Sequence, residues 1–401
     1  MSVGKLSKFP CVDLRLVTKL SERDLLMIPG PTNVDPRVLR SMARPTLAHT
    51  SGAFATILKE TLSSLAKIFQ TTGTVLPLAG SGTLGAEVAL SNILEPGDNV
   101  LAITGGYFGD RLAEICANLG SKVDKLEVPW GSAASISGVE KKLSAKPYKA
   151  LAAVHVDTST GVANPAKELA SLANRKGVLF VLDTVCSMGG MDVRVDEWGV
   201  NVCFTGSQKA LAVPPGMTVI SFDSKALRVR EERKTLPASY YGDLKRWQPI
   251  LADPTKYFAT HAVNMVYALD ESCRMILAEG LGERFKRHAK MASAFREGLR
   301  AMGLGLLCDD KVASDTLTVA HYPTGVSDVE FRRSMTEKFG VTIAGGLGPL
   351  KEKAFRVGHM GNVNRSDILT TLAAIEGSLS MQKYRFQLGA GVSAANAALA
   401  A

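Results

Sequence analysis

Short apolar segments alternate with amphipathic segments between about residues 55 and 280. The apolar runs predict strands at 74–78, 99–104, 150–156, 178–182 and 202–205, and the amphipathic segments predict helices at 53–69, 84–93, 109–119 and 165–176. This alternation is typical of a doubly wound α/β fold, in which crossover helices connect mostly parallel strands. Ligands bind such sheets at the carboxyl ends of the strands, so the polar residues that follow each strand are the first candidates for chemistry.

The pattern changes near residue 280. A long helix is predicted at 283–302, and short strands at 316–321, 341–344 and 354–358 then alternate with helices at 327–339 and 366–380. We therefore expect four parts: an N-terminal arm at 1–24, a large domain at 25–280, a smaller C-terminal α+β domain at 281–385 and a flexible tail at 386–401. The tail is expected because its sequence is uncharged and of low complexity.

Composition narrows the class of protein. The 401 residues are 46% hydrophobic and 21% charged, which is enough to bury a large core. No apolar run approaches the roughly 18–20 residues that cross a bilayer, so we expect no membrane association. The net charge of +9 suits anionic ligands, and its scattered distribution argues against a nucleic-acid partner.

The six cysteines do not have the spacing of a zinc site, and no C-terminal Ser-Lys-Leu is present. We expect a cytoplasmic protein, with an organellar leader left open.

A glycine-rich turn, Gly80–Gly85, lies between a predicted strand and a predicted helix. Its amides and the hydroxyls of Ser81 and Thr83 are suited to hold a phosphate at the positive end of the helix. The same residues match the dinucleotide pattern G-x-G-x-x-G, which requires an acidic residue at the end of the next strand. That strand ends in Thr104-Gly105-Gly106 without one. A nicotinamide-dependent oxidoreductase is therefore the weaker alternative, and a plain glycine turn is another.

Two further strand ends carry ionisable residues. Asp183 ends a buried strand, where a carboxylate is costly unless it meets a cation or several hydrogen-bond donors. Lys209 follows the next strand within an apolar turn, where desolvation favours the neutral amine that forms a Schiff base. A phosphate turn, an acid for a ring nitrogen and a reactive lysine together describe a pocket for pyridoxal 5'-phosphate.

Several motifs then resemble one family, over residues 25–380. They are GPTN at 30–33, GSG at 80–82, LEPGD at 94–98, STG at 159–161, Asp183, GSQKA at 206–210, PPG at 214–216, GGLG at 345–348 and FRVG at 355–358. In order and spacing they are similar to the class V aminotransferases of fold type I, and most similar to the alanine-glyoxylate and serine-pyruvate branch. The resemblance implies a large domain with a mixed, mostly parallel sheet, and pyridoxal phosphate as cofactor.

The resemblance also implies roles for individual residues. Lys209 would carry the Schiff base and move the substrate proton, and Asp183 would keep the pyridine nitrogen protonated. The remaining expected cofactor contacts are Ser81, Gly82, Thr83 and Gln208 at the phosphate, Phe108 on the ring face, Thr158 near the phenolic oxygen, and Tyr257 and Thr260 from the neighbouring subunit. Arg356 would bind the substrate, because a guanidinium grips a carboxylate through two parallel hydrogen bonds. Gly30 is also expected to contact the substrate.

The expected reaction is a ping-pong transamination from alanine or serine to glyoxylate or pyruvate. The expected partners are these small amino acids and 2-oxo acids, together with a second copy of the chain in a homodimer with shared active sites. A related reaction, such as pyridoxamine-pyruvate transamination, remains an alternative. Phe108 and Thr83 stand where the branch commonly has Trp and His, which bears on substrate preference.

Two other sets of residues are expected to be background. His155 and Asp157, two positions apart at a strand end, are similar to a metal-binding or catalytic pair, but the sequence supplies no third metal ligand. Cys308 would matter only in a cysteine desulfurase, and its surroundings lack the small residues expected around a mobile nucleophile.

Overall fold

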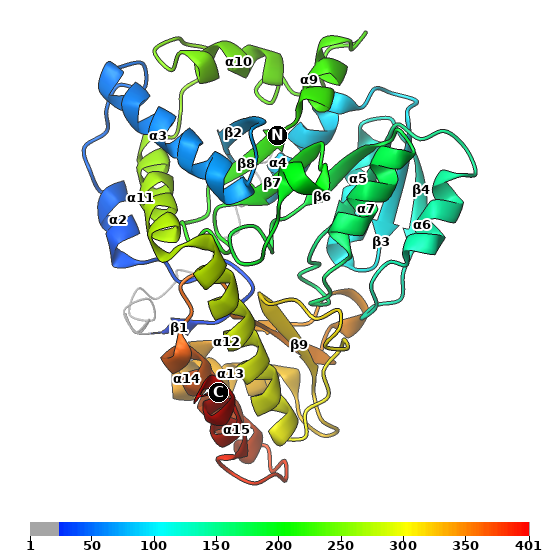
Figure 1. The fold of residues 1–401 in the computed structure, drawn as a ribbon. Helices are drawn as coiled ribbons and strands as arrows, with labels where there is room; N and C mark the ends of the chain where they lie inside the picture. The colour runs from blue at the N-terminus through cyan, green and yellow to red at the C-terminus, as the bar shows by residue number, and fades with distance from the viewer. Residues whose placement is uncertain (1–23, 401) are drawn as a thin grey trace, which may run out of the picture.

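The structure is a computed structural model that describes residues 24–400. The predicted N-terminal arm lies outside the described residues, except for Asp24. Figure 1 shows a large domain built around one sheet, with a smaller domain beside it and α12 (Leu281–Ala301) extending through the smaller one.

Seven strands form the sheet of the large domain, in the order β2-β8-β7-β6-β5-β3-β4. Their bounds are β2 Thr74–Ala79, β3 Asn99–Thr104, β4 Lys122–Glu127, β5 Ala150–Val154, β6 Leu179–Asp183, β7 Val202–Gly206 and β8 Met217–Phe222. β8 is antiparallel to both of its neighbours, and the other strands run in the opposite direction to it. The mixed, mostly parallel α/β sheet predicted from the sequence is therefore confirmed.

Helices cover both faces of this sheet, so its central strands are buried on both sides. In β6, Phe180 and Leu182 pack with one hydrophobic cluster, whereas Leu179 and Val181 pack with the other. This alternation follows from the two-residue period of a strand. The helices of the large domain are α2 Pro36–Met42, α3 Gly52–Phe69, α4 Gly82–Ile93, α5 Tyr107–Asn118, α6 Ile136–Leu143, α7 Ala166–Arg175, α8 Val195–Trp198, α9 Ser224–Glu231, α10 Leu244–Ala252 and α11 Val263–Glu279.

The small domain packs helices on an antiparallel sheet of three strands, in the order β11-β12-β9. The elements are β9 Leu317–His321, α13 Asp328–Phe339, β10 Val341–Thr342, β11 Ala344–Gly345, the 3-10 turn η1 Gly348–Leu350, β12 Ala354–Gly358 and α14 Arg365–Met381. The first described strand, β1 (Leu25–Leu26), pairs in parallel with β10. Residues 25–26 therefore join the small domain through a backbone ladder, and not the large domain as the sequence pattern suggested.

The predicted flexible tail is wrong for most of its length, because residues 390–400 form a helix, α15 (Ala390–Ala400). Figure 1 shows α15 alongside α12. Ala395 and Leu399 are buried in the hydrophobic cluster of the small domain. A Cβ added at Gly298 on α12 would lie 2.9 Å from the carbonyl oxygen of Gly391. The small residues that made the tail look featureless are the ones that let the two helices approach closely.

Between residues 24 and 400, no helix is both long enough and apolar enough to cross a membrane.

Glu376 anchors the start of α15. Its buried carboxylate accepts the backbone N–H groups of Gly389 at 2.7 Å, Gly391 at 2.8 Å and Val392 at 3.2 Å. Hydrogen bonds to a charged group contribute about 1.5–3 kcal/mol, so Glu376→Ala should lower the free energy of unfolding by about 2 kcal/mol, measured by urea denaturation. The exposed Glu337→Ala is the matched control and should change it by less than about 0.5 kcal/mol. Equal effects of the two substitutions would contradict the anchoring role.

Candidate active site

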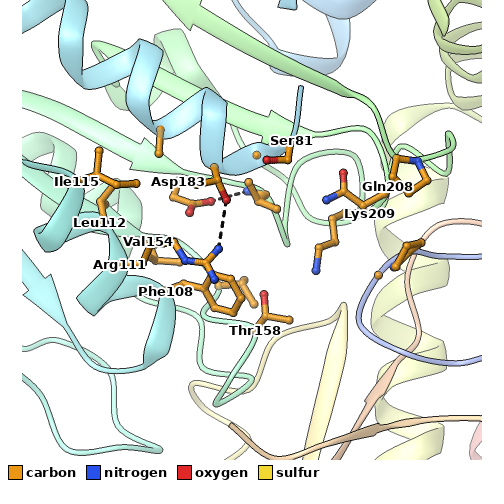
Figure 2. Close-up of a pocket in the computed structure, with 18 residues that line it drawn as sticks. Ser81, Phe108, Arg111, Leu112, Ile115, Val154, Thr158, Asp183, Gln208 and Lys209 are labelled. Carbon is orange, nitrogen blue, oxygen red and sulfur yellow. Dashed lines mark hydrogen bonds between the residues drawn. The ribbon is translucent and has the colours of Figure 1, made fainter. Parts of the chain in front are cut away.

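A cavity of about 290 Å³ lies at the carboxyl ends of the strands in the large domain. Figure 2 shows side chains from several strand ends and helix N-termini converging on it. Most of the site residues predicted from the sequence line it, namely Gly30, Ser81, Gly82, Thr83, Phe108, Thr158, Asp183, Gln208 and Lys209. Arg356, Tyr257 and Thr260 do not line this cavity.

The glycine-rich turn places the N-terminus of α4 against the cavity. Ser81 is the N-cap residue of α4, and its side chain makes no capping hydrogen bond. The amides of a first helical turn have no partner within the helix, so this end of α4 presents N–H groups and a hydroxyl to the cavity. Position 82 has little room for a side chain, because a Cβ there would lie 2.8 Å from Val185 Cγ2.

Asp183 ends β6, in register with Val154 on β5 and Phe204 on β7. One carboxylate oxygen accepts the N–H of Val185 at 2.8 Å. Burial removes water from the carboxylate and raises the pKa of Asp183 from 3.8 to about 7. An acid in this setting is stabilised by a cationic group placed against it.

Lys209 faces the cavity from the turn after β7. Its amine donates to the carbonyl oxygen of Pro29, and only 8% of the residue is exposed. The turn is held by Ser207, which donates to the Pro214 carbonyl at 2.7 Å, and by Thr32, which donates to the carbonyl of Lys209 at 2.9 Å. A Cβ at Gly30 would lie 2.5 Å from Lys209 Cδ, so this glycine lets the 29–31 segment rest directly on the lysine.

Phe108 and Arg111 lie one helical turn apart on α5 and line the same side of the cavity. The Arg111 guanidinium lies 4.7 Å from the centroid of the Phe108 ring, and its Nη1 donates to Thr83 Oγ1 at 3.3 Å. Arg111 was not among the site residues predicted from the sequence. The available signal was its position three residues after Phe108, on the same face of a helix. Arg111 contacts both positions at which the sequence departs from the residues common in the similar family.

Arg356 on β12 lies next to Thr158 from the large domain. Its Nε donates to the Gly345 carbonyl at 2.7 Å, and its Nη1 donates to the Thr158 carbonyl at 3.1 Å. Burial lowers the pKa of Arg356, which indicates a desolvated cation. The Thr158 hydroxyl lies 2.8 Å from Cys186 Sγ. The guanidinium does not line the cavity itself but is bonded to Thr158, which does.

Tyr257 and Thr260 lie in an exposed segment between α10 and α11. The Tyr257 side chain is 68% exposed and lies near His49, with ring centroids 5.5 Å apart. The structure does not bring either residue to the cavity of its own chain.

The remaining candidates from the sequence are His155 and Cys308. His155 Nδ1 lies 2.9 Å from Ser187 Oγ, and burial lowers its pKa to about 4. Burial also raises the pKa of the Cys308 thiol, which disfavours the reactive thiolate. Within residues 24–400, no cluster of three potential metal-ligating His, Cys, Asp or Glu side chains occurs.

The chemistry of the cavity fits pyridoxal phosphate. The N-terminus of α4 and the uncapped Ser81 hydroxyl suit the phosphate. Gln208 also lines the cavity, and its side-chain NH2 group is a donor that suits phosphate oxygens. The desolvated carboxylate of Asp183 suits a protonated ring nitrogen, and Lys209 supplies the amine.

Comparisons with known proteins point to one family. The family model described as "Aminotransferase class-V" matches residues 29–349. An uncharacterized aminotransferase of Methanocaldococcus jannaschii is 38% identical over 367 residues, covering 91% of this chain and 94% of the relative. The (S)-ureidoglycine–glyoxylate transaminase of Bacillus subtilis is 33% identical over 390 residues, covering 92% and 94%.

Solved structures agree with the sequence relatives. The ureidoglycine-glyoxylate aminotransferase from Bacillus subtilis has a TM-score of 0.91 at 33% identity, covering 95% of this chain and 99% of that one. The pyridoxamine-pyruvate aminotransferase from Mesorhizobium loti also has a TM-score of 0.91, at 27% identity, covering 95% and 98%.

The raised pKa of Asp183 predicts how stability varies with pH in the cofactor-free protein. Because the folded pKa of about 7 exceeds the ordinary aspartate value of 3.8, the folded state binds this proton more tightly, and its stability falls as pH rises from about 4 to about 7. The Asp183→Asn variant has no ionisable group at this position, so it should not lose stability in this way as the pH rises. We expect the variant to exceed the parent by about 1–2 kcal/mol near pH 8, less than the full shift because the side chain borders a cavity open to water.

Urea unfolding of both cofactor-free proteins near pH 4, 6 and 8 measures this difference, which should grow with pH. Parallel pH profiles would show that Asp183 is not desolvated.

Proposed function

Because the chain belongs to the class V aminotransferases, we propose that it transfers the amino group of a small amino acid, alanine or serine, to glyoxylate or pyruvate by a ping-pong mechanism. Enzymes of this family depend on pyridoxal phosphate, and so does this chain. Its glycine-rich turn is therefore better explained by phosphate binding than by dinucleotide binding. The observation that carries the proposal is the pairing of the Asp183 carboxylate and the Lys209 amine on one cavity.

We propose the following cofactor contacts. Ser81, Gly82, Thr83 and Gln208 would hold the phosphate at the N-terminus of α4. Asp183 would hold the protonated ring nitrogen, Phe108 the ring face and Thr158 the phenolic oxygen. When bound, the cofactor supplies an electron sink for the bond broken at the substrate Cα.

Lys209 would act on the proton at the substrate Cα. Its side chain is almost fully buried, which keeps bulk water away from the nitrogen that would accept that proton. The hydrogen bond to the Pro29 carbonyl holds Nζ at the cavity wall, so the amine is positioned before the substrate arrives. The same nitrogen would return the proton when the second substrate is aminated.

Arg356 would bind the substrate carboxylate. Two backbone carbonyls already accept from Nε and from Nη1, which fixes the plane of the guanidinium and leaves one N–H of Nη1 and both of Nη2 for a carboxylate. The cationic side chains lining the cavity, in the part of the chain described, are Lys209 and Arg111. Lys209 would act on the substrate Cα, and the Arg111 guanidinium already contacts the Phe108 ring and Thr83 Oγ1. Residues 24–400 therefore supply no further cation at the cavity for a second substrate carboxylate. This favours substrates with small, neutral side chains.

A homodimer with shared active sites would complete the cavity. Tyr257 and Thr260 are exposed and lie away from the cavity of their own chain. Their exposure supports a role in which they reach the phosphate of a second copy.

A donor and acceptor panel tests the proposed substrates. We expect the highest kcat/KM for alanine or serine with glyoxylate or pyruvate, and at least about tenfold lower values for aspartate and for 2-oxoglutarate, since a buried unpaired carboxylate is costly. Lys209→Ala is the inactive control. Pyridoxamine belongs in the panel because a pyridoxamine-pyruvate aminotransferase shares the fold. A preference for dicarboxylic substrates or for pyridoxamine would overturn the proposed specificity.

Arg356→Ala tests the carboxylate site. Losing a charge-assisted hydrogen-bond pair should raise the KM for alanine by about thirtyfold or more, while the cofactor still binds. Arg356→Lys should recover part of this loss, because an ammonium keeps the charge but not the planar fork. The control Arg365→Ala removes an exposed arginine of α14 and should leave KM within about twofold. An unchanged KM in Arg356→Ala would remove Arg356 from the site.

A further inference from the structure

Asp157 is a buried acid that the proposed chemistry does not use. Its residue is 4% exposed, and it lies in the turn that follows β5. One carboxylate oxygen accepts the backbone N–H groups of Phe108 at 3.0 Å and Gly109 at 3.1 Å. The other accepts the N–H of Ser159 at 2.9 Å and its hydroxyl at 2.5 Å. Both oxygens are therefore fully engaged.

These contacts cap α5 from a different part of the chain. The N-cap residue of α5 is Gly106, which has no side chain to satisfy the first-turn amides. Asp157 takes two of these amides, and Ser159 Oγ accepts a third from Tyr107 at 3.0 Å. A Cβ at Gly106 would lie 2.5 Å from Asp157 Cγ, so the glycine makes room for the carboxylate. A negative charge at a helix N-terminus is also favourable.

The same turn supports the substrate side of the cavity. Thr158 lies between Asp157 and Ser159 in sequence, and its carbonyl oxygen accepts Arg356 Nη1 at 3.1 Å. Its hydroxyl lies 2.8 Å from Cys186 Sγ. The 157–159 turn therefore touches Phe108 on one side and Arg356 on the other.

We propose that Asp157 is a positioning residue, which sets the Phe108 ring against the cofactor and holds the Thr158 carbonyl beneath Arg356. This inference rests on the proposed roles of Phe108 and Arg356. Asp157 does not line the cavity, so it acts through the residues it holds. Its charge also contributes to the raised pKa of Asp183, although less than burial does.

Asp157→Asn tests the proposal with little change in shape. In asparagine an NH2 group replaces one carboxylate oxygen. This group is a donor and cannot accept the N–H and O–H groups that the oxygen accepts in the parent, so contacts of at least one oxygen are lost. We expect the Kd for pyridoxal phosphate, titrated into cofactor-free protein, to rise by about tenfold, with a weaker visible circular dichroism of the bound cofactor. The KM for alanine should also rise. A purely structural role would lower stability without changing the dichroism of the bound cofactor.

A double-mutant cycle with Phe108→Ala identifies the route of the effect. If Asp157 acts on cofactor binding through Phe108, then adding Asp157→Asn to Phe108→Ala should raise Kd by less than about threefold. Ser159→Ala is a milder variant that keeps the carboxylate but removes the hydroxyl contacts, and it should raise Kd by about threefold. The control Asp270→Asn changes a buried acid of α11 that is paired with Arg274, away from the cavity, and should stay within about twofold.

The outcomes separate this inference from the proposed function. A parent protein that binds no pyridoxal phosphate would overturn the proposed function itself. A parent that binds it, with Asp157→Asn showing the parental Kd and dichroism, would overturn only the role of Asp157. If Asp157→Asn does not fold, Ser159→Ala decides in the same way: a parental Kd overturns the proposal and a raised Kd with altered dichroism supports it.

Discussion

The site depends on one electrostatic constraint, the desolvated carboxylate of Asp183 at the end of a strand buried on both faces. An acid in that position is poorly solvated, and burial raises its pKa to about 7. The Val185 N–H offsets part of this cost, and a cation placed close to the carboxylate would offset more of it. The sheet supplies the rest of the arrangement, because β2, β6 and β7 run in the same direction and end at the same edge, which brings the N-terminus of α4, Asp183 and Lys209 to the same cavity. A molecule with a cationic ring at one end and an anionic group at the other satisfies both ends of this cavity.

Much of this site was accessible from the sequence, since strand ends are marked by apolar runs followed by polar residues. Asp183 and Lys209 were found in this way, and the glycine turn by its pattern. Arg111 was missed because a charged residue on a helix normally faces water, and only the folded chain places its guanidinium over Phe108. The edge strand β4 was missed because its sequence, KVDKLE, has no apolar run. α15 was missed because a segment of mostly alanine and glycine shows no contrast between an apolar and a polar face. Its buried side becomes evident only from its packing in the small domain.

Other features lie beyond any local pattern. The sequence pair His155 and Asp157 suggested shared chemistry, but the two side chains face different partners: the imidazole lies against Ser187, and the carboxylate lies against the first turn of α5. Two residues that are two positions apart on a strand share a face, but β5 ends at Val154, so His155 and Asp157 lie in the irregular segment that follows it. Sequence spacing alone does not reveal which neighbours they meet there.

The segment from Met27 to Thr32 crosses from one domain to the other. Met27 accepts the N–H of Gly358 at 2.9 Å, at the end of the strand that carries Arg356. A few residues later, the Pro29 carbonyl accepts the Lys209 amine, and Thr32 bonds to the carbonyl of Lys209. The strand that carries Arg356, the residue proposed to bind the substrate carboxylate, is therefore connected to the carbonyl that holds the Lys209 amine through a few residues of backbone. Because the same short segment bonds to both, a displacement of β12 would be transmitted through two residues of backbone to the carbonyl against which the Lys209 amine rests.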